Sequence, residues 1–524
     1  MSKKNKVKIQ SVKAAKYNAS NAMINYYLVL IFTAFPLFFT NKFSNIRHDK
    51  LNAFLVLSCT LVFVEFIIFI VSHFERKRVG DFPEEKWYKQ LSFTDYAFGA
   101  LIVLYILSTV FSKYPLESLT GTQGRNNGLL LFIVYFLIYI VISRFYYFKE
   151  YVFALAACGC LVVFLLGILN FFFIDPLGMY AGYSEKVAED FTSTIGNKNL
   201  MSAFCCLTVP AFLLLFMNTK KSVLRYLYLV VSAVGFTAML CADSESGFLG
   251  FVPILALTLL YYSRNVSMLR KFFVAVSAML LCAKLLRVFS FVMQDVEKGF
   301  GTMQTLFIYN NKSFIVLAVT VLVSVGLYLM ERKNGVLELP RAVPFVLIGI
   351  YALALIVLIS LFVNYTFVDT ESKLGGVMSF FRFDEKWGTH RGYMWIKSFE
   401  IFKTSGIKNA LIGSGPDTFY SAFSPYFSEL NERFGNSSTN CAHNEFLNYL
   451  ITAGILGLAA YISVFVSAII KAVKSAKENY LALVFIAPVI CYFLQSVVNI
   501  ATPITTPLLF VFLALSQAVA RKKI

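Results

Sequence analysis

Long apolar stretches recur along almost the whole chain, and they constrain its fold more than any other feature. A helix needs about 20 mainly apolar residues to cross a hydrocarbon core about 30 Å thick. Stretches that approach or reach this length lie near residues 24–40, 51–72, 92–112, 128–146, 151–174, 200–217, 225–241, 247–262, 271–287, 313–330, 342–363, 445–470, 480–499 and 503–520. Because several are short, we predict an all-α, polytopic protein with about 12 to 14 transmembrane helices.

The composition agrees with this fold class. The chain is 58% hydrophobic and only 15% charged, whereas soluble domains carry about 25% charged residues. A basic segment precedes the first apolar stretch, and no small-residue cleavage site follows that stretch. We therefore expect the first stretch to be a retained span and not a removed signal peptide.

The net charge of +18 raises the question of a nucleic-acid partner, but the basic residues cluster in alternate loops. These clusters are Lys3 to Lys16 in the N-terminal tail, Arg76–Arg78, Lys220–Lys221, Arg264 with Arg270–Lys271, Arg332–Lys333, Lys471 with Lys474 and Lys477, and Arg521–Lys523. With fourteen spans they fall on one side of the membrane, which predicts that both termini are cytoplasmic. The excess charge is then explained by topology and by anionic lipid, and we predict no nucleic-acid partner.

This topology divides the chain into four parts: a cytoplasmic basic tail over residues 1–22, spans joined by short loops over 23–363, one large extracytoplasmic loop over 364–444, and three spans with a cytoplasmic C-terminus over 445–524. The polar loops at 121–128, 196–199 and 243–246 fall on the same outer side as the large loop. We therefore expect a site assembled from loop ends at the extracytoplasmic face.

Aromatic residues recur at helical spacing within the large loop. They are Trp395, Phe399 and Phe402 in a first group, and Phe419, Phe423 and Phe427 in a second. The pattern predicts two amphipathic helices at the membrane interface, with the Gly413-Ser414-Gly415 turn between them. Their aromatic faces either anchor the loop to the bilayer, which we favour, or line a groove for a lipid or a sugar.

Three cations of the outer loops are candidate ligands of a pyrophosphate. Arg391 lies beside His390 and just before a predicted helix start, and an arginine combined with a helix N-terminus suits a phosphate. Arg125 is on the outer side against the positive-inside bias, and Lys198 lies between two asparagines. Several fixed donors would stabilise charge on a leaving group. The structural alternatives are a snorkelling anchor for Arg391 and a solvated loop residue for Lys198.

His443 is the candidate general base, because a histidine of near-neutral pKa can accept a proton from an attacking hydroxyl. Asn444 and Glu445 are placed to orient the ring or the acceptor. Two alternatives remain: a helix-capping role for His443, and a Cys441/His443 nucleophile pair.

Asp243 and Glu245 are the only candidates for a metal pair, and a short solvated turn explains them better. The cysteines lie mostly inside predicted spans and show no zinc-ligand spacing. We predict no metal and no cofactor.

The order of the motifs resembles the O-antigen ligase and O-antigen polymerase superfamily. The resemblance lies in Arg391-Gly392-Tyr393-Met394-Trp395, Gly413-Ser414-Gly415, His443-Asn444-Glu445-Phe446-Leu447 and Gly454-Ile455-Leu456-Gly457, with the loops at 124–128 and 196–199 upstream. It implies a GT-C-like membrane glycosyltransferase that moves a glycan from undecaprenyl pyrophosphate to an acceptor hydroxyl of a glycan or glycolipid at the outer face of the cell membrane. Neither a nucleotide sugar nor a metal is implied.

By this resemblance Arg391 and Arg125 hold the pyrophosphate, and His443 is the base or an orienting residue; Lys198, Asn444 and His390 complete the expected substrate contacts. One departure stands out, because relatives often carry Ser-Arg-Gly where this chain has Ser244-Glu245-Ser246-Gly247. Ligation and repeat-unit polymerisation share this chemistry and are not separated. A flippase of lipid-linked oligosaccharides is the main alternative, although such transporters favour internal repeats and mid-span charges.

Overall fold

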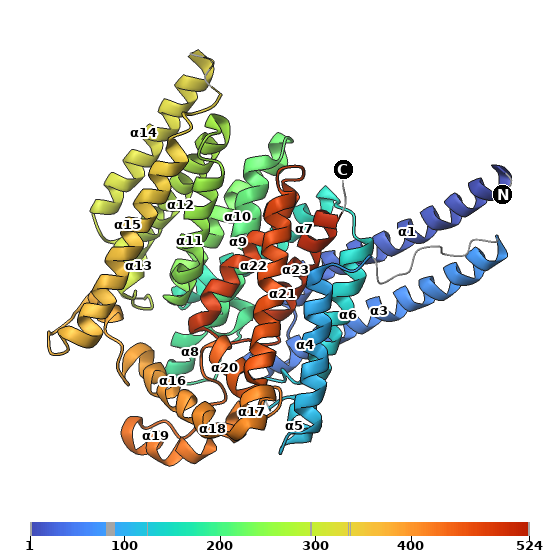
Figure 1. Cartoon of the computed structure of the whole chain (residues 1–524). Coiled ribbons are helices and arrows are strands. Elements are labelled where there is room, and N and C mark those ends of the chain that lie inside the picture. Colours follow the sequence, from blue (N-terminus) through green and yellow to red (C-terminus); the bar gives the residue numbers. More distant parts are fainter. Residues whose placement is uncertain are drawn as a thin grey trace.

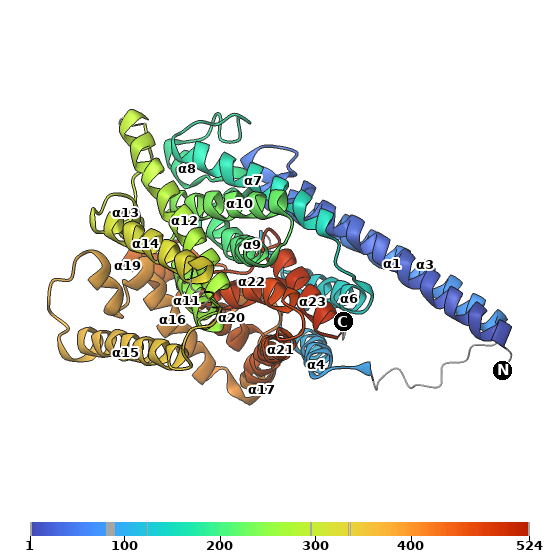
Figure 2. The same ribbon diagram turned by 90° about the horizontal axis from the view of Figure 1, so that it is seen from above.

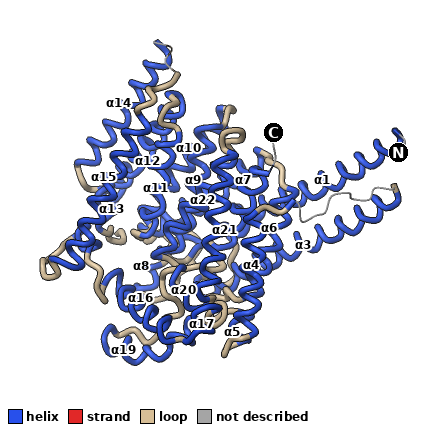
Figure 3. The backbone as a smooth tube through the Cα atoms, in the orientation of Figure 1, coloured by secondary structure: helices blue, strands red, loops and turns tan. Residues whose placement is uncertain are grey.

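The computed structural model describes residues 3–79, 90–122, 124–293, 296–333, 335 and 337–521. Helices joined by loops make up this part of the chain (Figure 3), and it contains no strand. Together with the apolar helices described next, this confirms the prediction of an all-α, polytopic membrane protein. Gln123 of the predicted 121–128 loop, and Lys522 and Lys523 of the C-terminal basic cluster, lie outside the described residues.

Eleven helical segments of the described chain are long and apolar enough to cross a membrane. They are α1 (Lys3–Phe32) continued by α2 (Ala34–Leu37), α3 (Ile46–Arg78), α4 (Phe93–Val110), α7 (Glu150–Phe171), α9 (Lys198–Asn218), α10 (Ser222–Cys241), α12 (Val266–Met293), α14 (Lys312–Lys333), α15 (Val343–Val363), α21 (Gly454–Ser475) and α22 (Leu481–Gln495). Three shorter apolar helices are α6 (Leu129–Phe145), α11 (Ser246–Tyr261) and α23 (Thr506–Arg521). Each predicted apolar stretch corresponds to one of these helices.

Two boundaries differ from the prediction. The first helix begins at Lys3 and runs through most of the predicted tail, because residues 3–32 contain no proline or glycine and many good helix formers. The stretch at 445–470 is broken near Ala453, so that its spanning helix begins at Gly454. Gly454 has a φ of +69°, and a Cβ there would lie 2.4 Å from the carbonyl carbon of Leu411. Only glycine fits this break.

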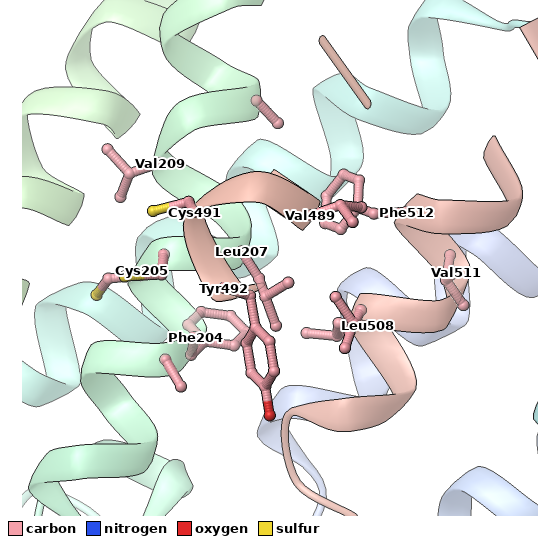
Figure 4. Close-up of a cluster of buried hydrophobic side chains, with 14 of the residues drawn as sticks. Phe204, Cys205, Leu207, Val209, Val489, Cys491, Tyr492, Leu508, Val511 and Phe512 are labelled. Atoms are coloured by element: carbon pink, nitrogen blue, oxygen red, sulfur yellow. The ribbon is translucent and has the colours of Figure 1, made fainter. Parts of the chain in front are cut away.

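Helix α9 forms the centre of the bundle, and the residues of its apolar window are all buried. It packs against α7, α10, α11 and α22. Figure 4 shows Phe204 and Leu207 of α9, Tyr492 of α22 and Leu508 of α23 within one buried apolar cluster. At the periphery, α1 and α3 extend away from the body as an antiparallel pair (Figure 2). Helix α15 has no buried residue.

The large loop folds into short helices at one end of the bundle, which we call the loop end. The short helices there are α5 (Pro115–Thr120), α8 (Glu185–Asp190), α16 (Trp387–Thr404), α17 (Gly406–Ile412), α18 (Phe419–Phe423), α19 (Phe427–Phe434) and α20 (Glu445–Thr452), and α13 (Thr302–Ile308) precedes α14. In Figure 1 the loop end is at the bottom, and both termini lie in the upper half.

The large loop shares an apolar core with α20, which changes the interpretation of its aromatic residues. Phe419 and Phe423 are fully buried in a cluster with Tyr393 of α16 and Leu430 of α19. They therefore do not face outward, as bilayer anchors would. The second predicted helix is interrupted at Pro425, which has no N–H with which to continue the helical hydrogen bonds.

Candidate functional site

The connection between α22 and α23, residues 496–505, brings the two predicted arginines together at the loop end. Arg391 donates from Nη1 to the carbonyl oxygen of Val498 at 2.7 Å. Arg125 donates from Nη2 to the carbonyl oxygen of Ala501 at 3.3 Å. Two arginines that are far apart in the sequence therefore reach neighbouring carbonyl groups of one short connection.

Arg125 is buried in an ion pair with Asp417. Its Nε donates to Oδ1 of Asp417 at 3.0 Å, and the two side chains are only 4% and 1% exposed. The backbone N–H groups of Thr122 and Asn127 both donate to Oδ2 of the same carboxylate at 2.9 Å. Burial opposes the charge of Arg125, but Cys441 and Asp417 outweigh it and raise the pKa of the guanidinium. Nη1 of Arg125 is buried and has no hydrogen-bond partner in the described part of the chain, so one donor is left for a ligand.

The Gly413–Gly415 turn places Asp417 in this pair. Gly413 has a φ of +78°, and a Cβ there would lie 2.2 Å from the carbonyl oxygen of Thr452. The next two N–H groups of the turn donate to the carbonyl oxygens of Ile451 and Thr452 at 3.0 and 2.9 Å. The turn is thus fixed against the end of α20, and glycine is required because a side chain would overlap the backbone.

An unusual backbone precedes Arg391. Gly388, Thr389 and His390 have φ values of +59°, +56° and +70°, and regular helical geometry follows them in α16. Two of these are not glycine, and non-glycine residues seldom adopt this region without a structural or functional reason. A Cβ on Gly392 would lie 1.8 Å from the carbonyl oxygen of Asp384. The His390-Arg391-Gly392 motif therefore fixes the direction in which the helix begins.

His390 and Arg391 are adjacent but make different contacts. The ring of His390 stacks on Phe434 of α19, with centroids 4.3 Å apart, inside the large loop. Its Nδ1 is buried and finds no partner among the residues described. Arg391 instead reaches the α22–α23 connection. The structure thus separates these two predicted site residues.

His443 lines a cavity of about 530 Å³ at the loop end, together with Thr122, Tyr420 and residues 438–440. Thr122 belongs to the loop that carries Arg125, so the two predicted motifs border one space. His443 has a φ of +50° and directly precedes Asn444, the N-cap residue of α20. Asn444 caps that helix, because its side chain accepts a hydrogen bond from the N–H of Leu447 at 3.1 Å. Capping is the contact that the structure gives Asn444.

The Cys441 thiol lies among the basic residues of the site. Burial opposes its ionisation, but His443 and Arg125 outweigh burial and lower the pKa of this thiol to about 6. The thiol also interacts electrostatically with Arg391 and with Arg47 at the start of α3. Three arginines and a histidine therefore interact electrostatically with one buried sulfur atom, and this concentration of positive charge favours an anionic ligand.

Glu445 is a buried acid two residues after His443. It belongs to α20, before the spanning helix, and it accepts hydrogen bonds from the hydroxyls of Tyr461 and Tyr492 at 2.7 and 2.8 Å. Burial raises the pKa of this carboxyl to about 7, although both tyrosines and Arg125 favour the charged form. Its protonation therefore changes within the ordinary pH range.

We expect Glu445 to make the folded state less stable as the pH rises. The pKa is about 7 in the folded chain, against a usual value of 4.5, so the folded state binds the extra proton between these values. The contribution of Glu445 to stability is complete below about pH 4.5 and is lost as the pH rises through about 7, by on the order of 3 kcal/mol. Thermal unfolding of the purified protein from pH 5 to pH 8 measures the loss. Glu445→Gln is expected to flatten the profile, and an equally steep profile in this variant would exclude Glu445 as its source.

Lys198 lies at the loop end but makes a solvent-exposed ion pair. Its Nζ is 3.1 Å from Asp190 of α8, and the two side chains are 40% and 50% exposed. The neighbouring Asn199 reaches the site instead. Its carbonyl oxygen accepts from Asn499 of the α22–α23 connection at 3.2 Å, and its Oδ1 accepts from Ser244 at 2.8 Å. The 196–199 motif is thus joined to the site by its asparagine.

The two acids of the 243–246 loop have separate roles. Oδ1 of Asp243 accepts the N–H of Gly301 at 2.6 Å. Glu245 interacts electrostatically with Arg391; burial lowers the pKa of that arginine, and Cys441 and Glu245 act in the opposite direction. Within the described ranges, no group of three or more His, Cys, Asp or Glu side chains could hold a metal ion. Glu245, at the place where relatives often carry an arginine, thus has a charge opposite to that of Arg391, with which it interacts.

The sequence analysis missed Asp417, Arg47 and the α22–α23 connection. Arg47 carries the same signal as Arg125, since it is an arginine in a predicted outer loop. Asp417 lies two residues after the Gly413–Gly415 turn, in a loop with as many acidic as basic residues, so its charge gives no signal of its own. The connection contains Asn499 between two apolar helices but carries no charge. Its role lies in its backbone carbonyls, which a sequence does not reveal.

The fold and the site define a class: a polytopic helical membrane protein with polar and charged loop ends gathered at one end of the bundle. Residues 300–462 match the family described as O-antigen ligase, from α13 into α21. This match supports the O-antigen ligase superfamily and agrees with the resemblance of the motifs. It includes Arg391, His390, His443 and Asn444, whereas Arg125 and Lys198 lie upstream of it. A sequence search of curated proteins gives no match.

Proposed function

We propose that the protein transfers a glycan from a polyprenyl-pyrophosphate donor, undecaprenyl pyrophosphate in the expected case, to a hydroxyl of a glycan or glycolipid acceptor. The observation that carries this proposal is the meeting of Arg125 and Arg391 at the α22–α23 connection, with Cys441 interacting with both Arg125 and His443. Positive charge in a partly buried site suits a pyrophosphate, and a neighbouring histidine suits proton removal from an alcohol. The O-antigen ligase domain supports the same chemistry.

In the proposed reaction, the acceptor oxygen attacks C1 of the donor sugar from the side opposite the pyrophosphate. The bond between C1 and the pyrophosphate oxygen breaks, and a new C1–O bond forms with inversion. The acceptor hydroxyl gives its proton to His443, and the leaving group departs as polyprenyl pyrophosphate. Arg125 and Arg391 stabilise the negative charge that grows on this leaving group, which is where fixed donors lower a barrier most. No metal or nucleotide sugar enters this proposal.

We place the loop end on the extracytoplasmic side of the cell membrane and both termini in the cytoplasm. The alternation of basic loops supports this orientation. A polyprenyl tail lying in the bilayer would then present its pyrophosphate at the level of the loop end.

Transfer is tested by reconstituting the protein into lipid vesicles with a labelled polyprenyl-pyrophosphate glycan and an acceptor glycan. We expect label to move to the acceptor with the wild-type protein and not with His443→Ala. Cys441→Ser is the matched control, and we expect it to keep transfer. Label that crosses the bilayer without reaching an acceptor would replace the proposal with a flippase, and loss of transfer only in the cysteine variant would move the reacting group to the thiol.

The same assay separates the two reactions that share this chemistry. A ligase joins one donor glycan to each acceptor and gives a single new product. A polymerase extends its product repeatedly and gives a ladder of repeat-unit lengths. The size distribution of the labelled product therefore decides between ligation and polymerisation.

A further inference from the structure

A second cavity lies at the loop end, beside α18, and the proposed reaction does not use it. Its volume is about 310 Å³, and it is lined by parts of α16, α17, α18 and α20, by Ser424–Tyr426, and by Lys113 and Tyr114 before α5. This volume is within the range of small-ligand sites, about 300 to 1,000 Å³.

Helix α18 separates this cavity from the one that His443 lines. Tyr420 borders the His443 cavity, and the next residue, Ser421, borders the second. Glu117 of α5 links the two sides, because one carboxylate oxygen accepts from Thr122 at 2.8 Å and the other from Ser421 at 2.7 Å. The two cavities therefore share one thin, hydrogen-bonded wall.

The lining of the second cavity has the chemistry of a sugar site. It presents several serine and threonine hydroxyls, the amide of Asn409, and the rings of Tyr114, Phe402 and Tyr426. Hydroxyl and amide groups exchange hydrogen bonds with sugar hydroxyls, and aromatic rings cover apolar surface. Oδ1 of Asn409 is buried and has no partner within the described residues, and a buried acceptor of this kind is costly unless a ligand satisfies it.

The charges of the second cavity favour the acceptor over the donor. Among the described residues that line it, Lys113 is the only charged one and none is an arginine. A pyrophosphate would find its partners at Arg125 and Arg391 instead. In a displacement with inversion the acceptor approaches from the side opposite the leaving group, so a cavity away from the arginines suits the sugar chain of the acceptor.

We propose that the cavity beside α18 is a glycan subsite, which holds the acceptor chain behind the sugar whose hydroxyl reacts in the His443 cavity. This inference rests on the proposed function. It assigns Asn409 a role in acceptor binding, away from the reacting atoms.

The test measures acceptor binding and transfer separately, with the full-length protein in detergent micelles. The probe is the repeat-unit oligosaccharide released by mild acid from the surface glycan of the producing cells. Saturation-transfer NMR is expected to show that this probe binds the wild-type protein. Asn409→Leu should weaken binding and raise the acceptor KM by about tenfold, the loss of about 1.4 kcal/mol, while kcat and the donor KM stay within about twofold.

Asn431→Leu is the matched control, since Asn431 is exposed on α19 and does not line the cavity. Ala422→Phe, which fills the cavity, should reproduce the effect of Asn409→Leu and serves if the latter does not fold. Unchanged binding and acceptor KM in both variants, or displacement of the probe by glycerophosphate headgroups, would overturn the subsite. If the wild-type protein binds the probe through Asn409 but transfers nothing, the proposed function fails and the glycan site stands.

Discussion

Replacing Arg391 by alanine is expected to reduce glycan transfer by about 10²–10³-fold while the protein accumulates normally in the membrane. Arg391 is partly exposed, and among the residues that the structure describes its side chain donates a hydrogen bond to the carbonyl oxygen of Val498. Its loss therefore costs little folding free energy. Its planar, permanently charged group suits a pyrophosphate oxygen pair, so the loss falls on the reaction.

The size of this effect is measured as the initial rate of label transfer at equal amounts of folded protein. Arg391→Lys keeps the charge but loses the bidentate geometry, and we expect an intermediate rate. Arg433→Ala is the control, because Arg433 is an arginine of the same loop that makes exposed ion pairs with Glu385 and Glu429. If Arg391→Ala transfers at the wild-type rate, the arginine does not contact the leaving group.

The helices of this protein were predictable because hydrophobicity determines them directly. Every long apolar stretch corresponds to a helix of the structure, and the described part of the chain contains no strand. Two breaks inside predicted helices depend on local features instead. The break before Gly454 follows from the backbone of α17 packing against it, and the interruption at Pro425 follows from one missing N–H. A hydropathy profile is an average over many residues, so it does not detect either of these local features.

The site was predictable in part because hydropathy and charge together indicate the side of the membrane on which a loop lies. This reasoning selected Arg125, Arg391 and His443, and the structure brings their segments together. It does not indicate which loops meet, so the buried partner Asp417 and the carbonyls of Val498 and Ala501 were not found. For the same reason, the sequence pointed to Lys198 and not to its neighbour Asn199, whose carbonyl oxygen accepts a hydrogen bond from Asn499 of the connection.

Replacing Asp417 by alanine is expected to lower the free energy of unfolding by about 3–5 kcal/mol, the usual cost of removing one partner of a buried ion pair. Arg125 would keep its charge in a site where 4% of its side chain is exposed. The N–H groups of Thr122 and Asn127 would also lose their shared acceptor. We therefore expect the Arg125 loop to open, and thermal unfolding in detergent to begin at a clearly lower temperature.

The Asp190–Lys198 pair is the natural control for this prediction. It joins an aspartate to another predicted cation at a similar distance of 3.1 Å, but its side chains are 50% and 40% exposed. Because solvent screens an exposed pair, Asp190→Ala should cost less than about 1 kcal/mol. Equal losses of unfolding free energy in the two variants would mean that burial does not determine how much these ion pairs stabilise the protein. A stable Asp417→Ala protein that no longer transfers glycan would instead show that the pair orients Arg125 for its ligand without holding the fold.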